Sequence, residues 1–145
     1  MNVSTLAFAV TCHQALAHPV RLRVLAALRD GRLCVGELQQ LSGLAFSTVS
    51  RHVSELERAG LVEQIKEGRW VWCRLAGGKA VRRTLECIWQ QLAPDPTLAA
   101  DRWRAQRLRA GRRGPVCGAT VGPCRDEVSS VVHDAAPAPA PKEIG

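Results

Sequence analysis

The sequence predicts a mainly α-helical fold with one small β-hairpin. Apolar residues recur at helical spacing through most of the first hundred positions. Two β-rich runs, 61–66 and 70–75, are joined by the residues 67–69 (Glu-Gly-Arg), which is a hairpin signal. The 145 residues suit one domain, or one small domain followed by a tail.

Four helical segments are predicted before the hairpin. The first covers 4–17 and ends before Pro19, because the residue that precedes a proline avoids helical torsion angles. The second begins at Pro19, and the third covers roughly 35–42. The fourth begins at about Ser47, which is a good N-cap residue. The apolar face of this fourth helix is formed by Val49, Val53 and Leu56.

Two further helices are predicted after the hairpin, over 81–92 and about 98–109. The third and fourth helices are separated by the turn Ser42-Gly43. Two short helices around a glycine turn, of which the second is amphipathic, are what a helix-turn-helix requires. The predicted architecture is therefore a winged helix-turn-helix, in which the helix after the turn enters the major groove of DNA.

The outer face of that helix carries small polar and basic side chains that can bond base edges or phosphates. Arg51 can bind guanine in a bidentate manner. Lys66 and Arg69 flank the hairpin tip and are candidates for phosphate contacts, with a solvated hairpin as the alternative. His52 is a candidate for the same surface, with a buried or capping role as the alternative. The candidate DNA-contacting residues are Ser47, Thr48, Ser50, Arg51, His52, Ser54, Lys66 and Arg69.

The charge balance and the absence of enzyme motifs limit the classes of function that the sequence allows. The chain has 20 Lys and Arg against 13 Asp and Glu, a net charge of +7, which suits an anionic partner such as nucleic acid. No apolar run approaches the length of a membrane-spanning helix, and no basic region precedes an N-terminal apolar segment, so we expect a cytoplasmic protein without a membrane partner. No hydrolase, metalloprotease or phosphate-loop motif is present, so we expect no enzyme, including one with a cysteine nucleophile.

The composition changes towards the C-terminus. We expect a DNA-binding and dimerisation domain over 1–93, a basic helix over 94–113, and a flexible Pro-, Gly- and Ala-rich tail over 114–145 that carries Cys117 and Cys124. The arginines from 102 to 113 are expected to form a solvated face or a dimer rim, with contact to the DNA backbone as the alternative. The six cysteines contain no C-x-x-C pair and, in a cytosolic chain, are not expected to form disulfides.

The runs LAHPVRLRVLAAL (16–28), STVSRHVSELERAGLV (47–62) and EGRWVWCRL (67–75) resemble the ArsR/SmtB family of winged-helix repressors. The resemblance covers about 13–92. It implies a homodimer built from the first and last core helices, a palindromic operator in double-stranded DNA, and release when an inducer binds. Within the family, the sequence most resembles the arsenic-responsive members.

In those members the third helix opens with three cysteines whose thiolates bind trivalent arsenic. Cys34 matches the first of them, whereas Gly36 and Gln39 stand at the second and third positions, so the usual ligand set is incomplete. Cys117 and Cys124 are candidate replacements, because soft thiolates favour soft acceptors. The alternatives are a structural Cys34 and two passive tail thiols. The resemblance implies no prosthetic group, with As(III), methylarsenite or Sb(III) as inducer.

Three other functions remain open at this point. The first is a redox-switched repressor whose thiols form a disulfide. Its response would be lost in the presence of reductant. The second is a winged-helix repressor that does not respond to metals. The third is a DNA-coating protein without a signal, which would show little sequence preference and a steep salt dependence.

Overall fold

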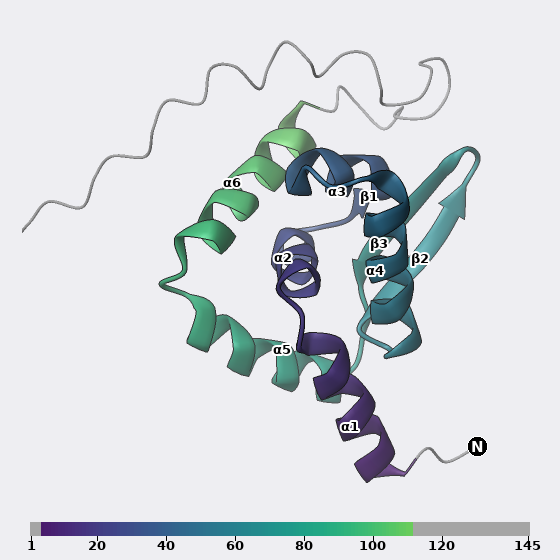
Figure 1. Cartoon of the computed structure of the whole chain (residues 1–145), viewed down its shortest axis with the longest axis vertical. Helices are drawn as coiled ribbons and strands as arrows, with labels where there is room; N and C mark the ends of the chain where they lie inside the picture. Colours follow the sequence, from purple (N-terminus) through teal and green to yellow (C-terminus); the bar gives the residue numbers. More distant parts are fainter. Residues whose placement is uncertain (1–3, 112–145) are drawn as a thin grey trace, which may run out of the picture.

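Helices make up most of residues 4–111, the part of the chain that the computed structural model describes. In chain order the elements are α1 (Thr5–Leu16), α2 (Pro19–Leu28), β1 (Leu33–Cys34), α3 (Val35–Ser42), α4 (Phe46–Arg58), β2 (Val62–Glu67), β3 (Trp70–Leu75), α5 (Lys79–Leu92) and α6 (Pro96–Ala110). Figure 1 shows α2 near the centre, with α5 and α6 on one side and α4 and the β-sheet on the other. A mainly helical fold with a small antiparallel sheet confirms the predicted fold class.

A three-stranded antiparallel sheet forms the wing, with the strand order β1-β3-β2. β2 and β3 form the predicted hairpin, and Gly68 turns it with a φ of 61°, where a residue with a side chain would be strained. The strand β1 is not predictable from its sequence, because two residues are too few to show an alternating pattern. The pairing of Leu33 with Cys73 and of Cys34 with Trp72 holds β1 in the sheet.

The helix-turn-helix consists of α3 and α4, which pack on α2. As its spacing predicts, the apolar face of α4 lies inward. The residues of this face, each 0% exposed, are Val49, Val53 and Leu56. They belong to one apolar cluster with Leu25 of α2 and Leu38 of α3. Gly43 ends α3 with a φ of 70°, a left-handed conformation that glycine adopts at little cost. The turn between the two helices therefore depends on this glycine.

The predicted N-cap of α4 is wrong by two residues. Ser47 is not the N-cap, because the helix begins at Phe46 and the N-cap is Ala45. The carbonyl of Ala45 accepts hydrogen bonds from the backbone N–H groups of Thr48 and Val49, at 3.0 and 3.1 Å. Ser47 is consequently an exposed residue of the first helical turn, and its side chain is not used as a cap.

Two salt bridges join α6 to α2 and to the residues directly after α2. Asp101 of α6 is 0% exposed, and its carboxylate accepts two hydrogen bonds from the guanidinium of Arg23, at 2.6 and 3.0 Å. Arg102 donates two hydrogen bonds to Asp30, at 2.6 and 2.9 Å. The guanidinium holds the pKa of Asp30 below its usual value. Part of the arginine run is therefore paired within the fold, a role that the predicted solvated face or dimer rim does not include.

The last turn of α6 closes on the segment that leads from α2 into β1. Arg109 donates hydrogen bonds to the carbonyl oxygens of Ala27 and Gly31. Gly31 has a φ of 145°, and a Cβ atom at this position would lie 3.3 Å from Nε of Arg109. This close approach favours glycine here. The C-terminal end of α6 thus lies beside the entry to β1 and α3.

Candidate nucleic-acid interface

The outward face of α4 is polar along its length. Ser47 and Arg51 are exposed, and Thr48, Ser50 and Ser54 are half-buried. Because the opposite face of α4 is buried in the core, these side chains form the surface that the helix presents to solvent. Hydroxyl and guanidinium groups bond both base edges and phosphates. The structure brings these five predicted residues together on one helix, and their contact with DNA stays a prediction.

His52 does not belong to this surface. Its side chain is 7% exposed, and its ring centroid lies 4.4 Å from that of His18, the N-cap of α2. In turn, Nδ1 of His18 accepts a hydrogen bond from the backbone N–H of Val20 at 3.2 Å. We therefore correct the assignment of His52 as a candidate DNA contact, because its ring packs against the start of α2. Sequence spacing alone places His52 beside Val53 and does not reveal the histidine pair.

The buried position of His52 makes folding dependent on pH. Burial lowers the pKa of His52 below its usual 6.5, and so do the charges of His18, Arg21 and Arg51, whereas Glu55 acts in the opposite direction. As pH falls below that usual value, the unfolded chain takes up a proton that the folded His52 resists. The free energy of unfolding then decreases, and the decrease ends once the folded His52 is also protonated.

We expect His52→Gln to reduce this loss of stability in urea titrations between about pH 5.5 and 7.5. His13→Gln is the matched control, because His13 lies on the exposed surface of α1. An unchanged pH dependence in His52→Gln, or an equal change in His13→Gln, contradicts the expectation.

The tip of the wing carries the two predicted basic residues, Lys66 and Arg69, and both are exposed. Arg32, which precedes β1, is not among the candidate residues predicted from the sequence. Its Nη1 donates a hydrogen bond to Glu67 at 2.9 Å, and its guanidinium lies over the Trp72 ring at 4.4 Å from the centroid. Arg32 therefore pairs with the acidic residue of the tip, which favours the approach of an anion to Lys66 and Arg69.

Removal of either wing cation should weaken DNA binding without changing sequence preference. We expect Lys66→Ala and Arg69→Ala each to reduce the slope of log affinity against log salt by about 1, because a phosphate contact releases counterions. Arg83→Ala, at an exposed position of α5, removes the same charge away from the wing and is the control. Titrations of specific and random duplexes by fluorescence anisotropy measure the effect. A loss confined to the specific duplex would indicate base reading instead.

The structure adds Phe46 to the candidate interface. Phe46 opens α4 and is 53% exposed, although large apolar residues are usually buried. It lies next to Ser47 at the end of the helix where helix-turn-helix proteins contact bases. An apolar side chain at that place is suited to the methyl group of thymine. The sequence signal is the aromatic residue directly before Ser47, which the misplaced helix start concealed.

The cysteines within residues 4–111 do not form a metal site. Cys34 is 2% exposed and is the N-cap of α3, where its backbone N–H donates a hydrogen bond to Glu37 at 2.8 Å. Burial raises the pKa of Cys12, and it raises the pKa of Cys73 to about 12, so both are thiols at neutral pH. No group of three His, Cys, Asp or Glu side chains able to hold a metal ion occurs in this part of the chain.

These positions favour a structural role for Cys34. The other two predicted ligands, Cys117 and Cys124, lie outside the described residues.

Comparison with known proteins agrees with this geometry. A family model described as a helix-turn-helix domain matches residues 16–65. The HTH-type transcriptional regulator CmtR of Mycobacterium tuberculosis is 43% identical over 82 residues, which are 57% of this chain and 70% of the relative. A homodimeric winged helix-turn-helix DNA-binding domain from Mycobacterium bovis, solved by NMR and described as a possible ArsR-family regulator, matches with a TM-score of 0.55 and 30% identity over 63% of this chain and 82% of that one. This chain belongs to the ArsR family.

Membership in the family settles the class of function. This ArsR-family protein is a DNA-binding transcriptional regulator and not an enzyme. It is also similar to the arsenic resistance transcriptional regulator ArsR1 of Pseudomonas putida, with 38% identity over 63 residues, 43% of this chain and 49% of that relative. Among residues 4–111, no helix has both the length and the apolar character needed to cross a membrane.

Proposed function

We propose that this regulator is a homodimeric repressor that places one α4 in each of two successive major grooves of a palindromic operator. The observation that carries the proposal is the polar outward face of α4, flanked by the two wing cations. The mycobacterial domain described above is homodimeric. On this chain, Leu6 and Val10 lie one turn apart on α1 and are 73% and 48% exposed, which suits a helix that packs against a second copy.

The spacing of the half-sites tests this arrangement. Two recognition helices related by a two-fold axis require half-sites about 10 base pairs apart, or one turn of DNA. We expect one dimer to bind such a palindrome, measured by sedimentation and fluorescence anisotropy. An insertion of about 5 base pairs between the half-sites turns them to opposite faces of the duplex and should abolish specific binding. Specific binding by a monomer, or indifference to the insertion, contradicts the proposal.

The signal that we propose is a thiophilic inducer, namely As(III), methylarsenite or Sb(III), bound by Cys117 and Cys124 with Cys34 as a third thiolate. The similarity to an arsenic resistance regulator and the preference of soft acceptors for thiolates support it. The burial of Cys34 weighs against a preformed three-thiolate site, because its sulfur lies inside the fold. We therefore place the first binding step on Cys117 and Cys124.

Serine variants separate these ligands. The probe is the DNA upstream of the gene that encodes this protein, and binding is followed by fluorescence anisotropy with reductant present. Micromolar arsenite should release the protein from this DNA, and the release should be lost in Cys117→Ser/Cys124→Ser. Cys34→Ser is the matched variant, since serine is an equally good N-cap and keeps α3 intact. Loss of release in Cys34→Ser shows that the third thiolate is recruited. Release by oxidant instead of arsenite, reversed by reductant, indicates the redox-switched alternative.

A further inference from the structure

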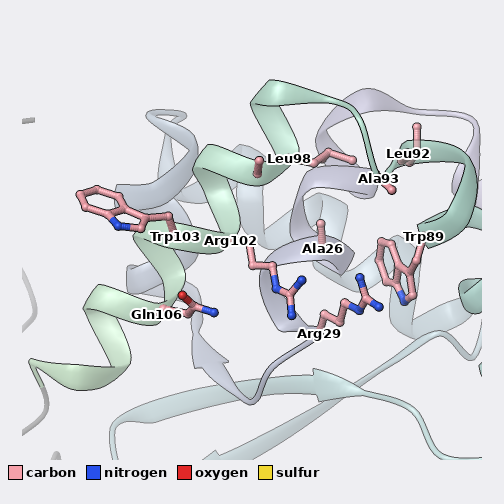
Figure 2. Close-up of a pocket in the computed structure, with 10 residues that line it drawn as sticks. Ala26, Arg29, Trp89, Leu92, Ala93, Leu98, Arg102, Trp103 and Gln106 are labelled. Carbon is pink, nitrogen blue, oxygen red and sulfur yellow. The ribbon is translucent and has the colours of Figure 1, made fainter. Parts of the chain in front are cut away.

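A cavity of about 320 Å³ lies between α2, α5 and α6 and is not used by the proposed DNA interface. Figure 1 shows α5 and α6 on the side of α2 that faces away from α4, and Figure 2 shows the residues that line the cavity. The volume is at the lower end of the range of small-molecule sites. The ligand would thus be small and would contact three helices at once.

One part of the cavity wall is apolar and aromatic. Ala26 of α2 is 6% exposed and Leu98 of α6 is half-buried. Two indole rings complete the walls, Trp89 from α5, which is 8% exposed, and Trp103 from α6, which is 49% exposed. Rings of this kind offer flat surfaces on which another aromatic ring stacks. These walls favour a planar, largely apolar ligand.

The charged groups at the cavity are cationic, and Gln106 adds a neutral amide. Arg29 lies over the Trp89 ring, with its guanidinium carbon 5.6 Å from the ring centroid, and Figure 2 shows this guanidinium beside the indole. Within residues 4–111 no carboxylate forms an ion pair with Arg29, whereas Arg102 on the opposite wall is paired with Asp30. None of the lining residues is acidic. Arg29 is therefore available to bind a carboxylate, for which a guanidinium offers two parallel hydrogen bonds.

We propose that this cavity binds a small aromatic carboxylate, with its ring against Trp89 and its carboxylate on Arg29. The two features of the site select the two parts of such a ligand. An inorganic anion would leave the apolar walls uncovered, and a neutral aromatic compound would leave the guanidinium without a counter-charge. This ligand site goes beyond the proposed repressor function and does not depend on DNA.

The test is a titration of the full-length, reduced protein with 1-naphthoate in the absence of DNA. Binding is measured by calorimetry and by tryptophan fluorescence. We expect saturable binding, and we expect the neutral 1-naphthamide to bind about tenfold more weakly. Arg29→Gln should weaken naphthoate binding by about the same factor and leave naphthamide binding unchanged. Arg82→Gln, at an exposed position of α5 outside the cavity, should change neither affinity. Because Arg29 is exposed, its replacement leaves the core intact.

Four outcomes overturn the proposal. They are the absence of saturable binding at millimolar naphthoate, equal affinity for the amide, an Arg29→Gln variant that binds as well as the wild type, and binding that appears only when sedimentation shows dissociation of the dimer. The last would mean that a second copy of the chain fills the cavity. None of these outcomes touches the DNA-binding proposal, because no duplex is present.

Discussion

Replacing Arg23 with methionine is expected to lower the free energy of unfolding by about 3 kcal/mol, because it leaves a buried carboxylate without its cationic partner. The carboxylate is that of Asp101, which is 0% exposed and accepts both of its short hydrogen bonds from Arg23. The remaining cation, Arg104, lies 3.4 Å away and is half exposed, so it replaces little of the lost interaction. Methionine retains the apolar stem, and the measured effect therefore reports the charge.

Urea denaturation measures this effect, and two further variants define its origin. Arg74→Met breaks the exposed Arg74–Glu63 pair, which should cost less than about 1 kcal/mol. In the double variant Arg23→Met/Asp101→Leu, both charges are gone, and stability should return towards the wild-type value. If Arg23→Met costs no more than Arg74→Met, or if the double variant recovers nothing, the buried ion pair does not hold α6 on α2.

Replacing Arg51 with alanine is expected to reduce operator affinity by about 1–3 kcal/mol and to relax the preference for one base in each half-site. Arg51 is exposed in the middle of the outward face of α4, and no carboxylate in the described part of the chain forms an ion pair with it. Its guanidinium is therefore free to bind the two acceptors of a guanine. Anisotropy titrations with the operator and with single-base variants measure both effects.

The matched control is Arg58→Ala on the same helix. Arg58 is exposed at the C-terminal end of α4 and is paired with Glu55 at 3.1 Å. Its removal takes away one charge without changing the centre of the helix, and we expect only a small loss that is the same for all duplexes. Equal losses on operator and random DNA for Arg51→Ala would show that Arg51 contacts phosphate and does not read a base.

The elements that the sequence predicts well are those whose signal is local. The i, i+4, i+7 spacing of Val49, Val53 and Leu56 gives both the helix and its buried face, and the turn at Gly68 gives the hairpin. The polar face of α4 follows from the same periodicity. Spacing along one helix is sufficient for these features, because each depends on residues within a few positions of one another.

The features that the sequence does not predict depend on contacts between distant segments. His52 of α4 is buried against His18 at the N-cap of α2. The start of α4 is a local exception, because the first hydrogen bonds of the helix go to a backbone carbonyl that any residue could supply. The arginines of α6 look like a solvated charged run until Asp30 and Asp101 are placed beside them in space. A single sequence carries no record of such pairs, because the partners are 34 to 78 positions apart.

The link between Arg23 and Asp101 also sets an order of events during protein synthesis. The two residues are 78 positions apart, so a ribosome that adds about 5–20 residues per second completes α2 several seconds before the carboxylate exists. A chain that stops before α6 retains every residue of the helix-turn-helix but lacks the partner of Arg23. Asp101 thereby distinguishes a chain that has reached α6 from one that stops before it, because only the former can pair with Arg23.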